Sequence, residues 1–225
     1  IRDRIFGNIT GRVDLTPWLY AQGRIGQDFY SRDQEYNLPT GSTRQAPAPP
    51  GFVNGQYVQD QLRFREINAD FLVGGSGAYG LVGMAANVGG NLMRRKSERN
   101  NVLVQDFFAR GTYNLSNGRL LNPDYTLSER QVNSLYGQAE LSYRSMAFLT
   151  GTLRNDWFST LSPENRSILY PSLAGSFVFT EVLPSAGWLT FGKLRAAYAE
   201  VGSDTDVPPY ADNLFYSIDS NFFHN

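Results

Sequence analysis

Apolar and polar residues alternate with a period of two along much of this chain, over stretches of about 9–11 residues, the length a tilted strand needs to cross a membrane. The stretch 135–144 places Leu135, Gly137, Ala139, Leu141 and Tyr143 on one side and Gln138, Glu140, Ser142 and Arg144 on the other. The stretch 147–157 repeats the pattern. Only 144–146 separates the two, so we predict a tight hairpin there.

The same alternation predicts strands paired in sequence order, near 5–13, 19–29, 62–73, 80–92, 135–144, 147–157, 172–181 and 191–201. The expected connections alternate in length, being short at 15–17, 74–78, 145 and 182–189 and long at 31–60, 95–133, 159–169 and 203–225. Short periplasmic turns and long extracellular loops are typical of transmembrane barrels. The predicted fold class is therefore all-β: an antiparallel up-and-down transmembrane β-barrel segment, about eight strands of a larger barrel.

The two sides of each predicted strand differ in polarity, and this predicts which way they face. We expect Ala139, Leu141, Leu149 and Leu153 to point outward to lipid, and Gln138, Glu140, Thr152 and Arg154 to point inward. An arginine on the lipid face at mid-membrane depth costs about 2–4 kcal/mol. A soluble sandwich would instead carry bulky residues throughout its apolar face, where this chain mixes glycine and alanine with larger residues.

Composition is consistent with a barrel and excludes several classes. Mean hydropathy is -0.35, and no run approaches the roughly 18 apolar residues of a membrane helix, yet an alternating strand averages to a polar value. Aromatic residues make up 14% of the chain and gather at predicted strand ends, at Trp18, Tyr20, Tyr79, Tyr143, Trp157 and Trp188. A net charge of -1 gives no reason to expect nucleic acid, and the absence of cysteine excludes a disulfide or thiolate metal site.

Several segments resemble strands of one family of outer-membrane proteins. The most specific run is Arg154-Asn155-Asp156-Trp157-Phe158-Ser159-Thr160-Leu161, followed by Asn165-Arg166-Ser167, Tyr170-Pro171-Ser172 and Ser176-Phe177-Val178-Phe179-Thr180-Glu181. The segment 192–202 and the earlier Phe6-Gly7-Asn8-Ile9-Thr10 and 23–29 continue the likeness. On these residues the chain resembles the SusC/RagA-type TonB-dependent transporters, and the resemblance covers most of the chain.

This resemblance implies a role and partners. Such proteins import large nutrients, commonly glycans or peptides, across the outer membrane of Bacteroidetes-type bacteria. A SusD-like surface lipoprotein caps the barrel, and TonB supplies energy through a plug domain. No segment of this chain resembles the plug, so we expect 1–225 to be a partial barrel. Inward charges such as Arg12, Glu66 and Arg154 also fit a wide lumen better than the side-chain-filled interior of an eight-stranded barrel.

Candidate sites for chemistry are weak. The run Gly75-Ser76-Gly77-Ala78-Tyr79-Gly80 matches a dinucleotide fingerprint, but strands flank it on both sides, so we interpret it as a glycine-rich hairpin turn. His224, the single histidine, lies in the terminal segment beside Phe222 and Phe223, and we interpret it as an incidental residue. Asp204-Thr205-Asp206 could offer oxygens to Ca²⁺ but fits a solvated loop better. We therefore predict no catalytic residue, metal or cofactor.

Aromatic residues in the predicted loops are the candidates for contact with a substrate or with the lipoprotein lid. They are Tyr36, Phe52, Tyr57, Tyr125, Tyr210 and Phe215. Such rings could stack on sugars or peptide side chains, or could instead form an interfacial girdle or fill a small core within a loop. The latter two roles are favoured by the general behaviour of aromatic residues in barrels.

Two alternative functions stay open at this level. A passive porin or adhesin barrel would share the strand pattern but would lack a plug domain. A small outer-membrane barrel enzyme would need a catalytic group at one rim, and with no cysteine and one histidine only carboxylates could supply it. The leading hypothesis is part of a TonB-dependent importer in the cell outer membrane, binding lipid, a SusD-like lipoprotein, TonB and a nutrient.

Overall fold

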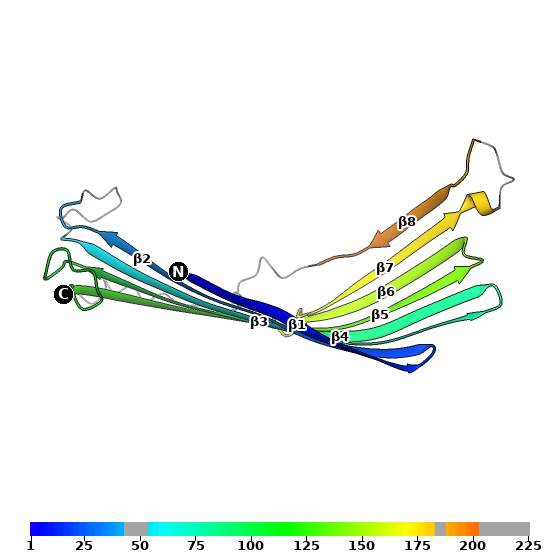
Figure 1. Cartoon of the computed structure of the whole chain (residues 1–225), viewed down its shortest axis with the longest axis horizontal. Helices are drawn as coiled ribbons and strands as arrows, with labels where there is room; N and C mark the ends of the chain where they lie inside the picture. Colours follow the sequence, from blue (N-terminus) through cyan, green and yellow to red (C-terminus); the bar gives the residue numbers. More distant parts are fainter. Residues whose placement is uncertain (43–53, 183–187, 203–225) are drawn as a thin grey trace. The chain divides into compact units, whose positions relative to one another are not determined.

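The computed structural model describes residues 1–42, 54–182 and 188–202. Its strands are β1 (Arg2–Thr16), β2 (Leu19–Leu38), β3 (Gln56–Tyr79), β4 (Val82–Gln105), β5 (Leu120–Tyr143), β6 (Ala147–Phe158), β7 (Ser167–Val178) and β8 (Lys193–Ala199), with one 3-10 turn, η1 (Phe179–Glu181), before β8. The strands form one eight-stranded sheet in the order β1-β2-β3-β4-β5-β6-β7-β8 (Figure 1). The predicted fold class and strand order are confirmed.

The chain divides into two compact units, each built from segments distant in sequence. Unit 1 comprises Ile1–Thr10, Arg24–Ala69 and Met93–Glu129, and unit 2 comprises Gly11–Gly23, Asp70–Leu92 and the chain from Arg130 onward. Unit 1 therefore contains the connections β2–β3 and β4–β5. Unit 2 contains the tight turns β1–β2, β3–β4 and β5–β6 and all of β6, β7 and β8.

Antiparallel register in unit 2 aligns residues of like polarity across the strands. Leu141 pairs with Leu149, which pairs with Gly175 on β7. One position further along, Glu140 pairs with Thr150. Because side chains alternate between the faces of a sheet, this register collects the odd-numbered residues of β5 and β6 on one face and the even-numbered ones on the other. The predicted grouping of Ala139, Leu141, Leu149 and Leu153 against Gln138, Glu140, Thr152 and Arg154 is confirmed.

The β5–β6 hairpin closes where the sequence predicts it. Arg144 and Ser145 both adopt positive φ, at 48° and 56°, and the Met146 amide donates to the Tyr143 carbonyl at 3.0 Å. The register leaves residues 144–146 between the paired Tyr143 and Ala147, and two successive residues of positive φ give this turn a twist that suits a hairpin. Glycine and asparagine are the usual residues in such turns, so the pairing of the flanking strands holds this backbone in place.

The prediction of a turn at 74–78 was wrong. Residues 75–79 continue strand β3, and the chain reverses at Gly80 and Leu81, where Gly80 has a φ of 58°. The small residues that suggested a turn instead allow close packing, since a Cβ on Gly74 would lie 2.6 Å from the Tyr20 ring. The interpretation of the glycine motif as part of a hairpin between strands holds, with only its last glycine in the turn.

The predicted long loops at 31–60 and 95–133 were also wrong at both ends, where the strands extend into them. Strand β2 runs on to Leu38, β3 begins at Gln56, β4 ends at Gln105 and β5 begins at Leu120. These strand extensions carry polar and charged residues on both faces, so the apolar alternation that marks the other strands is missing. The expected loop at 159–169 is shortened because β7 begins at Ser167, and 203–225 lies outside the described residues.

The predicted strand 172–181 ends early. Residues 179–181 form η1, and the Thr180 hydroxyl accepts a hydrogen bond from the Gly192 amide at 3.2 Å. This side-chain bond replaces a ladder bond and lets the backbone turn toward β8.

Few side chains are fully buried in the described part of the chain. A small cluster of Tyr57, Val104 and Phe107 forms the core of unit 1. In unit 2, the buried apolar residues are Val178 and the cross-strand pair Val132 and Phe158. A single sheet offers no second layer against which an apolar face could pack. Large apolar side chains such as Leu153, which is 52% exposed, therefore remain uncovered by protein.

Gly89 of unit 2 is required by close packing between strands. A Cβ at this position would lie 2.5 Å from the Phe71 carbonyl oxygen and 2.8 Å from the Tyr136 ring. The carbonyl belongs to the backbone of the neighbouring strand and cannot rotate away. Gly77 provides a contrast, because a Cβ added there would have no other atom within 4 Å.

We expect Gly89→Ala to destabilise the parent protein by about 1–3 kcal/mol through overpacking. Gly77→Ala should be neutral or slightly stabilising, because glycine disfavours a strand interior by about 0.5–1 kcal/mol relative to alanine. The measurement is guanidinium-induced unfolding of the purified full-length protein in detergent. Equal unfolding midpoints for the two variants would contradict the packing argument.

Candidate functional surfaces

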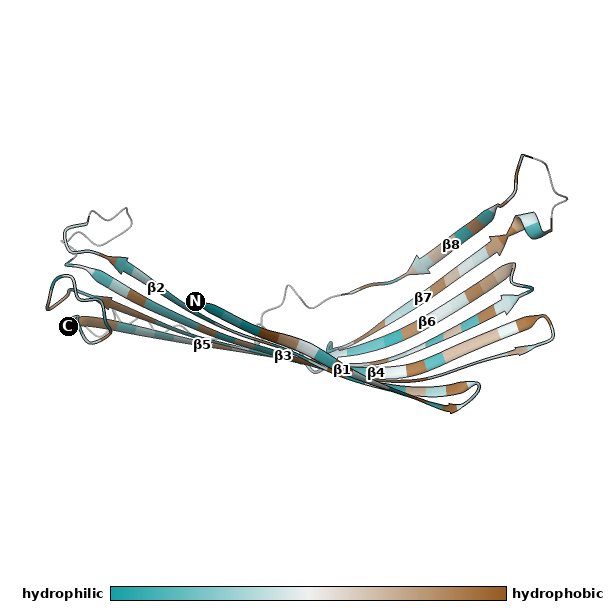
Figure 2. Ribbon diagram, in the orientation of Figure 1, coloured by the Kyte–Doolittle hydropathy of each residue, from teal (hydrophilic) through white to brown (hydrophobic). Residues whose placement is uncertain are grey.

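The apolar face of unit 2 extends across β5, β6, β7 and β8. Its large exposed residues are Leu135, Leu141, Leu149, Leu153, Leu169, Leu173, Phe177, Leu194 and Tyr198. Figure 2 shows the alternation as brown bands between paler and teal ones along β6 and β7. Contiguous exposed apolar surface of this kind marks a site of contact with lipid or another protein.

Aromatic residues lie at both ends of this apolar face. Tyr143 lies at the tight-turn end, opposite Ala147, and Trp157 lies at the other end of β6, opposite Asn133 and Ser167. The span 147–157 has the length of about 9–11 residues expected for a tilted membrane strand. Trp18, Tyr79 and Trp188, predicted at strand ends, lie in or beside the connections of unit 2 and are exposed.

The opposite face of unit 2, its polar face, is linked by side-chain hydrogen bonds. Arg154 Nε donates to Asp156 Oδ1 at 2.7 Å, and Arg154 Nη2 donates to Ser134 Oγ at 2.9 Å. Asn91 Nδ2 donates to Asp70 Oδ1 at 2.7 Å. Satisfying these groups within the sheet lowers the cost of placing them away from bulk water.

A hollow of about 610 Å³ lies on the polar face of unit 2. Its lining includes Glu140, Thr150, Lys193 and Arg195. The Lys193 ammonium lies 5.1 Å from the centre of the Phe148 ring, within range of a cation–π interaction. This hollow therefore combines charged side chains with an aromatic ring on the polar face.

Unit 1 carries a heavily charged surface on the face that includes Asp60. Asp60 is 7% exposed and lies between two arginines: Arg99 Nε donates to Oδ1 at 2.6 Å, and Arg32 Nη2 donates to Oδ2 at 2.9 Å. The hydrogen bond from Arg99, with its positive charge and that of Arg32, lowers the pKa of the Asp60 carboxyl. Three neighbouring strands, β2, β3 and β4, are thus joined through one carboxylate.

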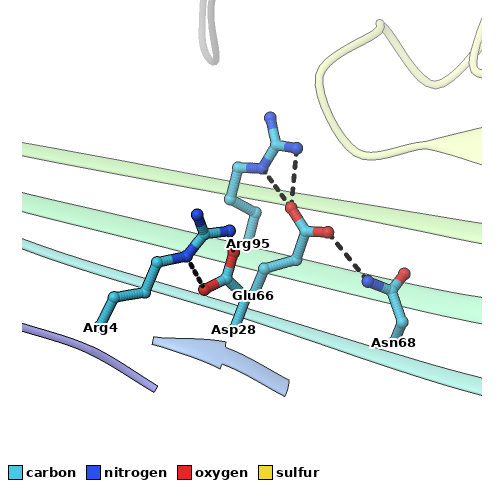
Figure 3. A network of polar contacts seen from close by, with 5 residues as sticks. All are labelled: Arg4, Asp28, Glu66, Asn68 and Arg95. Carbon is cyan, nitrogen blue, oxygen red and sulfur yellow. Dashed lines mark hydrogen bonds and ion pairs between the residues drawn. The ribbon is translucent and has the colours of Figure 1, made fainter. Parts of the chain in front are cut away.

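Two further ion pairs extend this charged face (Figure 3). Arg4 forms a bidentate pair with Asp28, with Nε to Oδ1 at 2.9 Å and Nη2 to Oδ2 at 2.7 Å. Arg95 Nε donates to Glu66 Oε2 at 2.8 Å, and Asn68 Nδ2 donates to Glu66 Oε1 at 2.9 Å. Strands β1 to β4 are therefore connected by charge-assisted bonds on one side of unit 1.

The other side of unit 1 is also charged, unlike the apolar face of unit 2. Lys96 Nζ lies 2.7 Å from Glu98 Oε1 and 3.6 Å from Glu129 Oε1. Arg63 and Arg65 contribute positive charge near Glu98, and together these contacts lower the pKa of the Glu98 carboxyl, with the Lys96 hydrogen bond as the largest cause. Both faces of unit 1 are thus suited to water.

The β4–β5 connection, residues 106–119, is folded on itself by side-chain bonds. Asn117 Nδ2 donates to the carbonyls of Ala109 and Thr112, and Asn117 Oδ1 accepts from the Ala109 amide. Phe107 and Tyr113 pack edge to face with ring centres 5.7 Å apart. The connection is therefore a structured projection with its own small core.

The structure separates the predicted loop aromatics by environment. Tyr36 lies in β2 and Tyr125 in β5, and both are exposed. Tyr57 lies in β3 and is 5% exposed within the Tyr57–Val104–Phe107 cluster, so it fills a core instead of facing a ligand. Placing these three in loops was wrong. Phe52, Tyr210, Phe215, the Asp204–Asp206 pair and His224 lie outside the described residues.

Sequence reasoning missed the ion-paired Arg32, Asp60, Arg95 and Arg99 of unit 1, because 31–60 and 95–133 were interpreted as loops. The available signal was the spacing of charged residues within each strand. Asp60 and Glu66 are an even number of residues apart in β3, and so are Arg95 and Arg99 in β4, so each pair shares one face of its strand. Among residues 1–42, 54–182 and 188–202, no group of three or more histidine, cysteine or acidic side chains could hold a metal ion. In the same part of the chain, no helix has the length and apolar character to cross a membrane.

An antiparallel sheet built from hairpins in sequence order, with an apolar face and a polar face in unit 2, has the architecture of a segment of a large β-barrel wall. Solved structures with a similar fold include the RagAB peptide transporter, with a TM-score of 0.75, 16% identity, 88% of this chain covered and 22% of that chain. The RagAB peptide importer in the "closed-closed" state matches with a TM-score of 0.75 and 16% identity, over 92% of this chain and 24% of that chain. These likenesses establish that the chain has the fold of a β-barrel segment.

In sequence, the chain is 34% identical over 108 residues to TonB-dependent receptor P26 of Formosa agariphila. That match covers 45% of this chain and 11% of the receptor. No family model matches the chain. The chain therefore spans about a tenth to a quarter of the length of the proteins it resembles. The resemblance to TonB-dependent transporters, and the interpretation as part of a larger barrel, are confirmed by these comparisons.

The ion pairs at Asp60 predict a pH dependence of stability. Because the folded-state pKa is lowered, Asp60 stabilises the fold above its ordinary pKa of about 4, and this contribution is lost as pH falls through the lowered value. We expect Asp60→Asn to cost roughly 1–2 kcal/mol at pH 7, since both arginine partners are partly exposed. The loss should shrink toward pH 3.

Hydrogen exchange of the amides in 58–62 and 97–101 in the full-length protein measures this effect. Asp3→Asn is the matched control, because Asp3 is exposed and forms no ion pair with any residue that the structure describes. Equal protection of these amides in the Asp60 variant and the wild type at pH 7 would argue against the Asp60 bridge.

Proposed function

We propose that this chain forms eight neighbouring strands in the wall of an outer-membrane TonB-dependent importer of large nutrients. The observation that carries the proposal is its 34% identity to TonB-dependent receptor P26. The RagAB-like fold supports the same assignment. The comparison proteins are named as transporters or receptors, which supports a transport role and not an enzymatic one.

The apolar face of unit 2 is proposed to contact the lipid acyl chains. Lipid supplies the apolar layer that a single sheet lacks, and it tolerates the mixture of glycine, alanine and leucine because acyl chains fill gaps. Tyr143 and Trp157 then lie near the two membrane interfaces, where aromatic side chains are favoured.

The outer limit of the membrane is proposed from the change in polarity along the strands. On β4, alternate positions from Val82 to Leu92 are largely apolar, whereas Arg94, Lys96 and Glu98 follow at the same spacing. On β3, Ile67 and Phe71 give way to Arg65 and Arg63 in the same manner. A strand of 24 residues is far longer than the roughly 10 that cross the hydrocarbon, so β3 and β4 extend beyond it on the side of the long connections.

The polar faces are proposed to line the lumen and its extracellular entrance. There, the ion pairs of unit 1 and the exposed Tyr36 and Tyr125 would meet the nutrient or the lipoprotein lid. The outer edges of β1 and β8 would leave backbone groups unpaired in hydrocarbon at several kcal/mol each, which supports further strands in the parent protein. A SusD-like lipoprotein and TonB, acting through a plug, complete the proposal.

The membrane orientation predicts opposite outcomes for two adjacent substitutions on β6. Leu153→Arg would place a charge in lipid at a cost of up to about 2–4 kcal/mol. Thr152→Arg would place the same charge toward the aqueous lumen. We expect markedly less folded, heat-modifiable protein in outer-membrane fractions for Leu153→Arg and near wild-type levels for Thr152→Arg. Equal levels of the two variants would contradict the assignment of the faces.

The transport function predicts energy-dependent uptake. A strain lacking the parent gene should lose growth on one or more high-molecular-mass nutrients while it still grows on their monomers. A protonophore should abolish initial uptake of that nutrient in the wild type, because TonB draws on the proton gradient. Uptake that needs the gene but persists with the protonophore would favour the passive porin instead.

A further inference from the structure

An open, apolar hollow of about 630 Å³ lies at the tight-turn end of unit 2. It is lined by β3, β4 and β5 together with the β1–β2 turn, and all of these segments belong to unit 2. The lining includes the small residues Gly77, Ala86 and Ala139 and the larger Trp18, Met84 and Leu141. The hollow exists because small residues on three neighbouring strands lie between larger ones.

The hollow opens on the apolar face of the sheet. A Cβ on Gly83 would lie 2.5 Å from Ser142 Oγ, so these two residues share a face, and Ser142 belongs to the polar face of β5. Their neighbours Met84 and Leu141 therefore lie on the apolar face, since side chains alternate along a strand. Glu140 also borders the hollow, but its carboxylate accepts a hydrogen bond from a threonine hydroxyl on the polar face.

A cation lies at the end of this hollow, in the β5–β6 turn. The guanidinium carbon of Arg144 lies 5.4 Å from the centre of the Tyr143 ring. Tyr143 follows Leu141 by two residues on the same face, which is about 7 Å along a strand. The Arg144 amide donates to the Leu81 carbonyl at 2.9 Å, so the β5–β6 turn lies against the β3–β4 turn. The strands on either side of both turns are paired within the sheet, away from its outer strands β1 and β8.

The Arg144 side chain is exposed, and it makes no ion pair with any residue of 1–42, 54–182 or 188–202. Its positive charge therefore acts on whatever occupies the end of the hollow. The aromatic rings of Trp18 and Tyr143 lie at the same tight-turn end, and such amphipathic rings are favoured at the level of lipid headgroups.

The pairing of an apolar hollow with a cation selects one kind of occupant. A soluble anion would gain nothing from the hollow, and a purely apolar partner would gain nothing from Arg144. A phospholipid satisfies both, because an acyl chain fills the hollow and a phosphate lies at the turn. Filling a gap in an apolar surface restores dispersion contacts that the surrounding residues otherwise lack.

We infer that this hollow and Arg144 form a binding site for an anionic glycerophospholipid, called here the Arg144 lipid site. One acyl chain lies along Gly77, Ala86 and Ala139, and the phosphate lies beside the guanidinium. The inference rests on the proposed importer and its membrane orientation, in which the tight turns face the periplasm. It adds to that proposal a specific lipid partner in the periplasmic leaflet.

Native mass spectrometry of the delipidated full-length protein in detergent tests the headgroup contact. The probes are dioleoylphosphatidylglycerol, which is anionic, and dioleoylphosphatidylcholine, which carries the same chains with no net charge. We expect the wild type to retain more of the anionic lipid. Arg144→Gln should lower that retention about 5-fold, the size expected for one basic side chain near anionic lipid. Arg144→Lys should keep most of it, since the attraction depends on charge.

Arg166→Gln is the matched control for the charge. Arg166 is exposed and lies in the β6–β7 connection, whereas Arg144 lies in the connection at the opposite end of β6. The substitution removes the same charge from the same unit without touching the hollow. We expect lipid retention by Arg166→Gln to equal that of the wild type.

Filling the hollow tests the acyl-chain contact independently of charge. A Cβ on Gly77 would have no other atom within 4 Å, so Gly77→Leu can be accommodated while its side chain occupies the hollow. Retention of both lipids should fall about 5-fold or more, because each acyl CH₂ that loses its apolar contact weakens binding. Gly151→Leu adds the same side chain on β6, outside the lining, and should leave retention unchanged. Heat-modifiability of each variant verifies that the barrel has folded.

Several outcomes would overturn the Arg144 lipid site. Equal retention of the two lipids by the wild type is one, and unchanged retention in Arg144→Gln or Gly77→Leu is another. An equal loss in either control variant would show that the effect is not local. Displacement of the lipid by glycerol 3-phosphate would indicate a site for a soluble phosphate instead. A dimer that Gly77→Leu dissociates would indicate an interface between two copies of the protein.

Failure of this inference is distinguishable from failure of the import proposal. The lipid assay uses no energised membrane, so it reports the hollow and Arg144 alone. Gene-dependent, protonophore-sensitive uptake without lipid preference would reject the lipid site and retain the importer. A lipid preference that depends on Arg144, with uptake insensitive to the protonophore, would retain the lipid site and reject TonB-dependent import.

Discussion

The constraint on which this structure depends is that a single β-sheet cannot cover its own apolar face. The register across β5 to β8 gathers leucines such as Leu141, Leu149 and Leu153 on one side, and no described element packs over them. In water such a face would drive aggregation, whereas in a bilayer the acyl chains complete the missing layer. The mixed sizes of the side chains and the aromatic residues at the strand ends follow from this one requirement.

The charged extensions of unit 1 fit the same constraint in the proposed membrane orientation. Strands that extend beyond the hydrocarbon would have water on both sides, so apolar alternation would no longer stabilise them. Charge-assisted bonds across the ladder take its place, as in the bridge from Arg32 through Asp60 to Arg99. A partly exposed ion pair contributes little by itself, but pairs that join successive strands hold long hairpins in one register. A fixed register is what places Arg2, Tyr30, Phe64 and Arg95 in line.

Transport would draw on both faces for different reasons. The apolar face would anchor the wall in lipid, and the polar face offers groups whose hydrogen bonds are already satisfied within the sheet, such as Arg154 with Asp156 and Ser134. A solute can pass a surface of satisfied groups without being held tightly.

The sequence by itself determined the strand number, the order, the faces of β5 and β6 and the hairpin at Arg144 and Ser145, because a period of two survives wherever one face meets an apolar phase. It misplaced the ends of β2 to β5 and put Tyr57 in a loop, because strands wetted on both sides lose that period. Only the tertiary structure decided which charges pair and which rings stack. Residues such as Asp60 and Arg99 are 39 positions apart, and their contact depends on a register that local sequence does not encode.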